Sequence, residues 1–114
     1  MQYLVQLRLN SSARPAGREE GITFMEKVIL PTLERCKRLQ EERKILAGLP
    51  VSGAIALVLI VTAESAKELD DLLTSLPVWP SMETEVIPLT TFDGRIQSLL
   101  PRLADMKAQP GGGQ

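Results

Sequence analysis

The sequence predicts an α+β fold in the order β-α-β-β-α-β. Three observations support this prediction. Apolar residues alternate in the first segment, a helical repeat follows, and a glycine-centred turn then precedes a well-capped second helix. A length of 114 residues suits one domain, and a short amphipathic extension follows the last predicted strand.

The first predicted strand covers residues 2–9, where side chains alternate between two faces. One face is apolar and the other is wetter. The apolar face holds Tyr3, Val5, Leu7 and Leu9, and the wetter face holds Gln2, Gln6 and Arg8. Residues 10–20 are rich in Ser, Ala, Pro, Gly and charge, and they predict a mobile loop.

A helical pattern runs from residue 22 to about residue 46, with a charged run on its outer face. The apolar positions recur at helical spacing and are Met25, Val28, Leu33, Cys36 and Leu39. Pro31 interrupts the pattern, because an interior proline removes a hydrogen bond and clashes with the preceding turn. Either the helix begins at Pro31 or one helix kinks there, and we favour one kinked helix.

Two strands are predicted on either side of Ser52-Gly53, at residues 45–51 and 54–61. A two-residue hairpin turn is expected between them, because glycine tolerates a positive φ. The strand from Ile55 to Val61 is apolar on both faces, which is typical of a strand that is covered on both sides.

The second helix begins with a capping box, in which Ser65 is followed three residues later by Glu68. Its apolar stripe then contains Ala66, Leu69, Leu72, Leu73 and Leu76. Pro77 ends the helix, and residues 83–89 form the fourth strand, with Pro88 at an edge or where pairing stops.

This order is the ferredoxin-like split β-α-β arrangement, predicted here for residues 1–92. Residues 93–108 form an amphipathic extension that opens with a turn at Asp93-Gly94 and is interrupted at Pro101. Residues 109–114 are rich in Pro and Gly and predict a disordered tail.

A single ferredoxin-like layer leaves one face of its sheet without helices. A second copy is the simplest cover for that face. We therefore expect a two-fold dimer, a dimeric α+β barrel with a pocket between sheets and helices, and assembly into higher homo-oligomers. The C-terminal segment is expected to dock on the partner.

Composition excludes several functions. The net charge is −1, which gives no electrostatic footprint for nucleic acid or for an anionic membrane. The longest apolar run, residues 51–63, is too short to span a bilayer and contains polar residues. No secretory signal pattern is present, so a cytoplasmic location is expected.

Histidine is absent and Cys36 is the single cysteine, so zinc sites of the Cys/His type and histidine-based triads are excluded. Cys36 lies on the apolar stripe of the first helix without an activating histidine. A buried structural cysteine is therefore favoured over a nucleophile.

The stretch from Arg38 to Leu89 resembles the muconolactone isomerases and their chloromuconolactone-dehalogenating relatives. The match is one of spacing rather than of a single catalytic motif. It rests on Arg38-Leu39-Gln40, Lys44, Gly53, Leu69, Asp71, Leu76-Pro77, Pro80, Met82, Glu85-Val86 and Leu89.

This resemblance implies a small ferredoxin-like protein that forms large cytoplasmic oligomers, often decamers, and serves aromatic catabolism without metal or organic cofactor. The implied reaction is an intramolecular isomerisation, in which a proton moves within an unsaturated lactone and its C=C bond shifts. One positioned base could remove and return the proton, with a cation or hydrogen-bond donor holding the substrate.

The chain departs from that family just after the hairpin. The relatives carry His, Tyr and a polar residue there, whereas this chain has Ala54-Ile55-Ala56-Leu57. The predicted pocket wall, including Ala54 and Leu57, is therefore apolar. This indicates a more hydrophobic ligand than muconolactone, or lost catalysis.

Glu34 and Lys44 are the predicted catalytic residues. The relatives also have an acidic residue at the position of Glu34. Glu34 would act as the base if it were buried and faced the pocket, although a charged residue on a solvated helix face is the simpler explanation. Lys44 would hold a substrate carboxylate or stabilise an enolate, yet a lysine at a helix C-terminus also favours the helix dipole.

Arg8, Gln6 and Trp79 are the other predicted substrate-binding residues. Arg8 and Gln6 would point into a sheet-lined pocket or simply face water. Trp79, between two prolines, would pack at a subunit interface or gate the pocket. Glu85, with Glu83 on the same strand face, matches a family glutamate, and protection of a sheet edge explains it equally well.

Two functions from different classes remain open. The first is a cofactor-independent isomerase of the muconolactone isomerase type, acting on a small unsaturated lactone or related cyclic compound. The alternative is a non-catalytic oligomeric protein that binds a small ligand in an apolar pocket. A pure scaffold would require the pocket to be filled by side chains.

Overall fold

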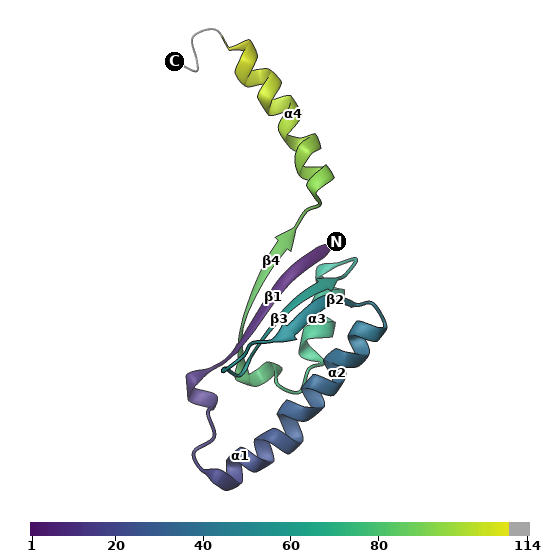
Figure 1. Cartoon of the computed structure of the whole chain (residues 1–114). Coiled ribbons are helices and arrows are strands. Elements are labelled where there is room, and N and C mark those ends of the chain that lie inside the picture. Colours follow the sequence, from purple (N-terminus) through teal and green to yellow (C-terminus); the bar gives the residue numbers. More distant parts are fainter. Residues whose placement is uncertain (110–114) are drawn as a thin grey trace.

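We describe the protein from a computed structural model that defines residues 1–109. Its four strands form one antiparallel sheet in the order β2-β3-β1-β4 (Figure 1). The strands are β1 (Gln2–Leu9), β2 (Ile45–Pro50), β3 (Ala56–Thr62) and β4 (Met82–Leu89). This topology confirms the predicted ferredoxin-like α+β fold.

The helices connect the strands on one side of the sheet (Figure 1). Between β1 and β2 lie a 3₁₀ turn (Ser11–Ala13), α1 (Arg18–Phe24), a π turn (Met25–Ile29) and α2 (Leu30–Glu41). Between β3 and β4 lie α3 (Ala66–Thr74) and a second 3₁₀ turn (Trp79–Ser81). Helix α4 (Phe92–Ala108) follows β4.

The hydrophobic core lies between α2, α3 and one face of the sheet. The strands contribute Val5, Leu7, Ile45, Leu57, Leu59 and Val61, and the helical segments contribute Leu39, Leu69, Leu72, Leu73, Leu76 and Val78. Leu7 pairs directly with Leu57 on β3 and with Thr84 on β4, which sets the register of the central strands. The alternation predicted for residues 2–9 therefore has the correct phase.

The predicted start and end of the first helix are both wrong. Helical structure begins at Arg18, inside the predicted loop, and ends at Glu41 rather than near residue 46. Arg43 takes a left-handed φ of 62°, which turns the chain into β2. Pro31 lies in the first turn of α2, directly after the π turn. Ile29 and Leu30 keep right-handed helical dihedral angles, so the helix continues through this point.

The predicted two-residue hairpin turn is wrong. Pro50 and Leu57 are the last paired residues, and Val51 N–H donates to the Ala56 carbonyl at 2.9 Å. The connection is therefore longer, with Gly53 at a φ of 79°. The chain of β2 also approaches β3 closely, since a Cβ on Gly48 would lie 2.7 Å from Leu59 Cδ2.

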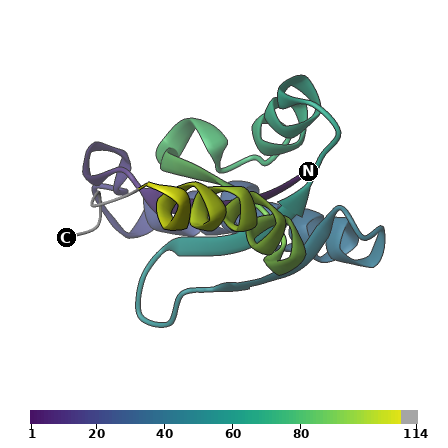
Figure 2. The ribbon, with the colours of Figure 1, turned by 90° about the horizontal axis from the view of Figure 1, so that it is seen from above.

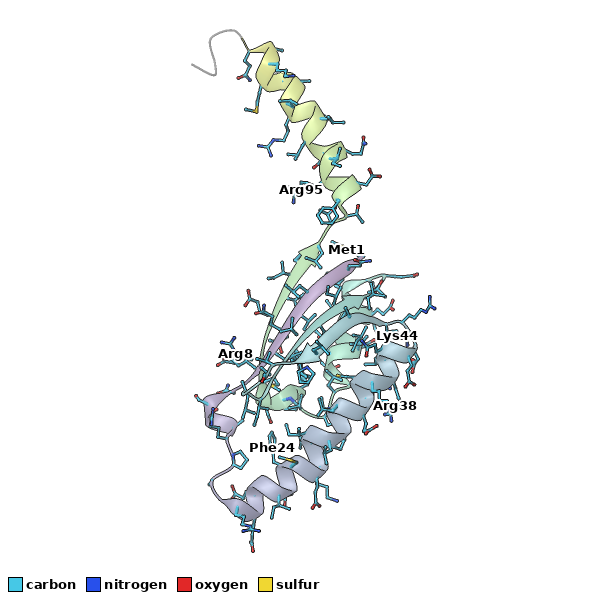
Figure 3. The ribbon with its side chains drawn as sticks, in the orientation of Figure 1. Met1, Arg8, Phe24, Arg38, Lys44 and Arg95 are labelled. Carbon is cyan, nitrogen blue, oxygen red and sulfur yellow. The ribbon has the colours of Figure 1, made fainter. Side chains whose placement is uncertain are left out.

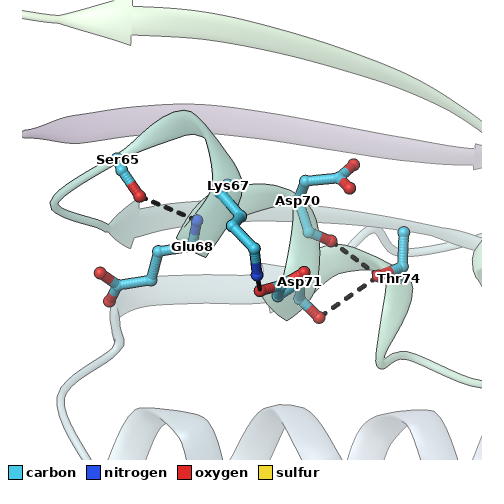
Figure 4. Close-up of polar contacts among 6 residues, drawn as sticks. All are labelled: Ser65, Lys67, Glu68, Asp70, Asp71 and Thr74. Atoms are coloured by element: carbon cyan, nitrogen blue, oxygen red, sulfur yellow. Dashed lines mark hydrogen bonds and ion pairs between the residues drawn. The ribbon is translucent and has the colours of Figure 1, made fainter.

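Helix α3 begins as predicted. Ser65 Oγ accepts a hydrogen bond from Glu68 N–H at 3.1 Å (Figure 4), and Glu68 Oε2 accepts one from Glu64 N–H at 3.1 Å. Lys67 pairs with Asp71 at 2.7 Å on the exposed face. The buried face carries the predicted leucines, so the helix packs on the sheet along that stripe.

The C-terminal extension is one continuous helix. Asp93 and Gly94 lie in its first turn and not in a separate turn, and Pro101 lies within it without ending it. Thr91 caps the helix by accepting from Gly94 N–H at 2.9 Å. Helix α4 projects beyond the end of the domain (Figure 1), and in the view from above it lies in front of the sheet (Figure 2). Of the predicted tail, residues 110–114 lie outside the described part of the chain.

None of the helices within residues 1–109 is both long enough and apolar enough to cross a bilayer.

Thr32 provides a specific test of the core. It is a buried polar residue on α2, and its Oγ1 accepts a hydrogen bond from Val78 N–H at 3.0 Å. Thr32→Val should lower the free energy of unfolding by about 1 to 3 kcal/mol, because it leaves this buried N–H without a partner. Urea unfolding at one fixed protein concentration measures the effect.

Thr32→Ser is the matched control, because it keeps the hydroxyl acceptor and removes only a methyl group. A Thr32→Val protein at least as stable as Thr32→Ser would show that this hydrogen bond contributes nothing.

Candidate functional site

The open face of the sheet carries two short polar rows at the hairpin end. Arg8 stands opposite Glu83 on β4, and Gln6 stands opposite Glu85. Because side chains alternate along a strand, all four point to the face away from the helices. Directly opposite Cβ atoms lie about 4.5 to 5.5 Å apart, so each acid is a close neighbour of a donor.

These rows border a hollow of about 340 Å³. Its other walls come from the hairpin and from the open face of β3, including Val51, Ala56 and Val58. Polar groups therefore line one side of the hollow and aliphatic groups the other. Small-molecule sites commonly combine these two kinds of wall at this size.

The charged side chains that line the hollow form no ion pair with one another within residues 1–109. Among residues 1–109, the ion pairs are Lys44–Glu42 and Lys67–Asp71, and neither involves Arg8. Arg8, Glu83 and Glu85 are exposed, and Gln6 is half-buried. A guanidinium, an amide and two carboxylates are thus available to a ligand. Together they can bind an anion and move a proton.

Ala54 lines a different pocket, on the helix side of the sheet, and Leu57 borders both this pocket and the hollow. It has a volume of about 150 Å³ and is almost entirely apolar. Its walls are Ile29, Thr32, Leu33, Pro50, Ala54, Ile55, Ala56, Leu57, Val78 and Met82. The only side-chain hydroxyl in this wall is Thr32, which already bonds to Val78 N–H. Acid/base chemistry has no participant there.

Lys44 lies far from Arg8, and Figure 3 shows the two at opposite ends of the sheet. The Lys44 carbonyl accepts from Thr62 N–H at 3.0 Å, whereas Arg8 pairs with Ala56. Residues 56 to 62 of a strand span about 20 Å at roughly 3.3 Å per residue. The structure therefore does not bring Lys44 to the rows on the open face.

Lys44 instead borders a polar groove of about 330 Å³ between α2 and α3. Its ammonium group lies 3.7 Å from a Glu42 oxygen. On the same groove, the hydrogen bond and charge of Asp71 raise the pKa of Lys67 (Figure 4). The two lysines that border this groove are thus each paired with a neighbouring carboxylate.

The remaining predicted site residues are dispersed. Glu34 is exposed on α2 and borders neither the hollow nor the apolar pocket. Trp79 is half-buried and packs against the core of its own chain. Cys36 is half-buried beside α2's apolar stripe, and burial raises the pKa of its thiol, with Arg35 opposing the shift.

Sequence reasoning placed Glu83 and Glu85 on one strand face but did not join them to Arg8 and Gln6. The missing information was the pairing of β4 with β1, which period-two alternation within a strand does not specify. A ferredoxin-like order does imply this pairing, so the signal was present in the topology.

Metal ligands are not grouped in the described structure. Within residues 1–109, no cluster of three or more Cys, Asp or Glu side chains could hold a metal ion.

Comparisons with known proteins agree with the topology. Residues 1–94 match the family described as muconolactone delta-isomerase. A crystal structure of muconolactone isomerase superposes with a TM-score of 0.62 and 25% identity, covering 80% of this chain and 90% of that one. No curated protein sequence gave a significant match.

A second solved structure shares the fold. It is 5-chloro-2-hydroxyhydroquinone dehydrochlorinase from Burkholderia phenoliruptrix AC1100, in complex with 2,5-dihydroxybenzoquinone. The TM-score is 0.60 and the identity 19%, with 82% of this chain and 98% of that chain covered.

The raised pKa of Cys36 predicts that its thiol is alkylated slowly. Because burial disfavours the thiolate, alkylation of the folded protein by iodoacetamide should accelerate only at a higher pH than for a free cysteine. Rates measured between pH 7 and pH 10 by mass spectrometry test this. The urea-unfolded chain is the control, and equal pH profiles in the two states would contradict the prediction.

Proposed function

Because this chain belongs to the muconolactone delta-isomerase family, we propose that it is a cofactor-independent isomerase of a small unsaturated lactone or related cyclic compound. One observation carries the proposal. Two carboxylates, a guanidinium and an amide meet at one hollow on the open sheet face. This is the set of groups that an internal proton transfer needs.

In the proposed reaction, Glu85 removes a proton from the ring carbon next to the double bond. The C–H electron pair then delocalises into the conjugated system as an enolate. The protonated Glu85 returns the proton to the far carbon, and the C=C bond has moved. No electron acceptor is required, because the substrate and product are isomers.

Arg8 would hold the substrate carboxylate or the developing enolate oxygen, and the Gln6 amide would donate a second hydrogen bond. Glu83 lies opposite Arg8 in the register and would orient the guanidinium. Glu85 is then the acid left free to act as base. The aliphatic wall of the hollow would exclude water from the reacting carbons.

The open sheet face also supports self-association. Leu4, Val58 and Ile60 lie on it half-buried, and Leu49 is 76% exposed. A second copy stacked on this face would bury these side chains and enclose the hollow between two sheets. The proposed setting for such an oligomer is cytoplasmic aromatic catabolism.

The activity is tested with the full chain and a panel of enol-lactones in deuterated buffer, followed by NMR. Deuterium should enter the ring as the double bond migrates. A panel left unexchanged and unbound would refute the proposed function.

Glu85→Gln should lower kcat by roughly 100-fold or more, because the amide cannot accept the proton. Arg8→Met should mainly raise KM. Steady-state kinetics on the best lactone measures both effects. Glu34→Gln and Lys44→Met are the controls, and we expect them to retain activity.

These controls also test the pair predicted from sequence. If Glu34→Gln or Lys44→Met abolishes turnover while Glu85→Gln retains it, the chemistry belongs to the helix and not to the open face.

The apolar pocket favours a second function, that of a non-catalytic ligand-binding protein. Its volume of about 150 Å³ and its aliphatic walls suit an uncharged ring of benzene size. Under this alternative, calorimetry should detect binding of benzene or toluene in both wild type and Glu85→Gln, with no turnover of any lactone.

A further inference from the structure

Helix α4 presents an apolar stripe that its own chain does not cover. Every residue of the helix is exposed, and the helix projects beyond the sheet (Figure 1). We call its apolar residues the α4 stripe: Phe92, Ile96, Leu99, Leu100, Leu103 and Met106. Residues 95–108 also lie beyond the family match, so this element is an addition to the shared domain.

The helix needs a packing partner to persist. In proteins most helical stability comes from packing of an amphipathic face rather than from helix propensity, and this applies to the 17 residues of α4. Pro101 lies inside it and disfavours helix by about 3 kcal/mol relative to alanine. Stability must therefore come from burial of the α4 stripe.

A second uncovered stripe lies at the other end of the molecule. It consists of Ile22 in α1, Met25 in the π turn and Leu30 at the start of α2, which are 47%, 53% and 51% exposed. We call these three residues the α1 stripe. Leu30 N–H donates to the Met25 carbonyl across the π turn, so these two residues are one turn apart and share a side. The molecule is 70 Å long, and Figure 1 shows α1 and α4 at its opposite ends.

The charged residues near the two stripes differ in sign, with a small positive excess on α4 and a small negative excess on the α1 side. Arg95, Arg102 and Lys107 outnumber Asp93 and Asp105 on α4. On the α1 side, Glu19, Glu20 and Glu26 outnumber Arg18 and Lys27 over residues 18–29. Contact between the stripes would place a basic border beside an acidic one.

Pairing of α4 with another α4 is electrostatically unfavourable. Ile96, Leu99, Leu103 and Met106 follow an a/d heptad pattern, which puts Arg95 and Arg102 at g and Lys107 at e. A parallel pair would set Arg102 against Lys107 of the other helix, and an antiparallel pair would set arginine against arginine. The acidic α1 surface carries no such repulsion.

We propose that α4 docks its stripe on the α1 stripe of a second copy of this chain. Since each copy has both surfaces, a two-fold axis across the long molecule makes the exchange reciprocal. The docking is separate from the open sheet face, which stays available for the stacked copy and the hollow proposed above.

Disulfide trapping tests the contact directly. Leu103→Cys and Met25→Cys chains, each also carrying Cys36→Ser, are purified separately, mixed and mildly oxidised. The expected product is a cross-linked dimer that contains one chain of each kind. Leu103→Cys mixed with Leu49→Cys is the control, since Leu49 is an apolar residue on the sheet that is more exposed than Met25.

Three results would overturn the proposal. Leu103→Cys chains linked mainly to each other would show pairing of α4 with α4. Preferred linkage to Leu49→Cys would place α4 on the sheet. A chain carrying both Leu103→Cys and Met25→Cys that oxidises only within itself would show that α4 folds back.

Light scattering gives an independent measure. Leu99→Glu should weaken self-association about tenfold or more, because it buries an unpaired charge in the contact. Gln97→Glu, on the polar side of the same helix, should leave the association constant unchanged. Circular dichroism and lactone turnover verify that the domain is intact. Unchanged association in Leu99→Glu would contradict the proposal whatever the activity.

Discussion

The whole structure depends on the burial of one face of the sheet and not the other. Val5, Leu7, Leu57, Leu59 and Val61 all point toward α2 and α3, and together they form the greater part of the strand contribution to the core. The period of two in a strand then sends every intervening side chain to the opposite face. The core thereby decides which residues can meet a ligand.

That opposite face has two different ends. Near the hairpin, β1 and β4 set Arg8 and Gln6 beside Glu83 and Glu85. Farther along, the same strands carry Leu4 and Ile87. A charged row beside an aliphatic surface can hold a polar ligand group and still exclude water from an apolar one. The hollow lies where these properties meet, and Ala56 and Leu57 separate it from the apolar pocket on the helix side.

The helices show how local irregularities extend the molecule. The first helix contains a π turn directly before α2 and continues past Pro31 as one rod from Arg18 to Glu41. Because this rod is longer than the sheet it covers, α1 projects at one end, as α4 does at the other (Figure 1). Each projection leaves apolar side chains in solvent, which is unfavourable for a monomer.

The sequence by itself determined the element order, the core-facing residues of β1, the capped start of α3 and hence the ferredoxin-like class. These depend on short-range periodicity and capping, which neighbouring residues specify. Only the tertiary structure decided the register of the paired strands, and hence which distant polar residues stand opposite each other. Lys44 and Arg8 share one sheet yet lie at its opposite ends, whereas Arg8 and Glu83 are distant in sequence and directly paired. Strand pairing brings such residues together, and local pattern does not encode it.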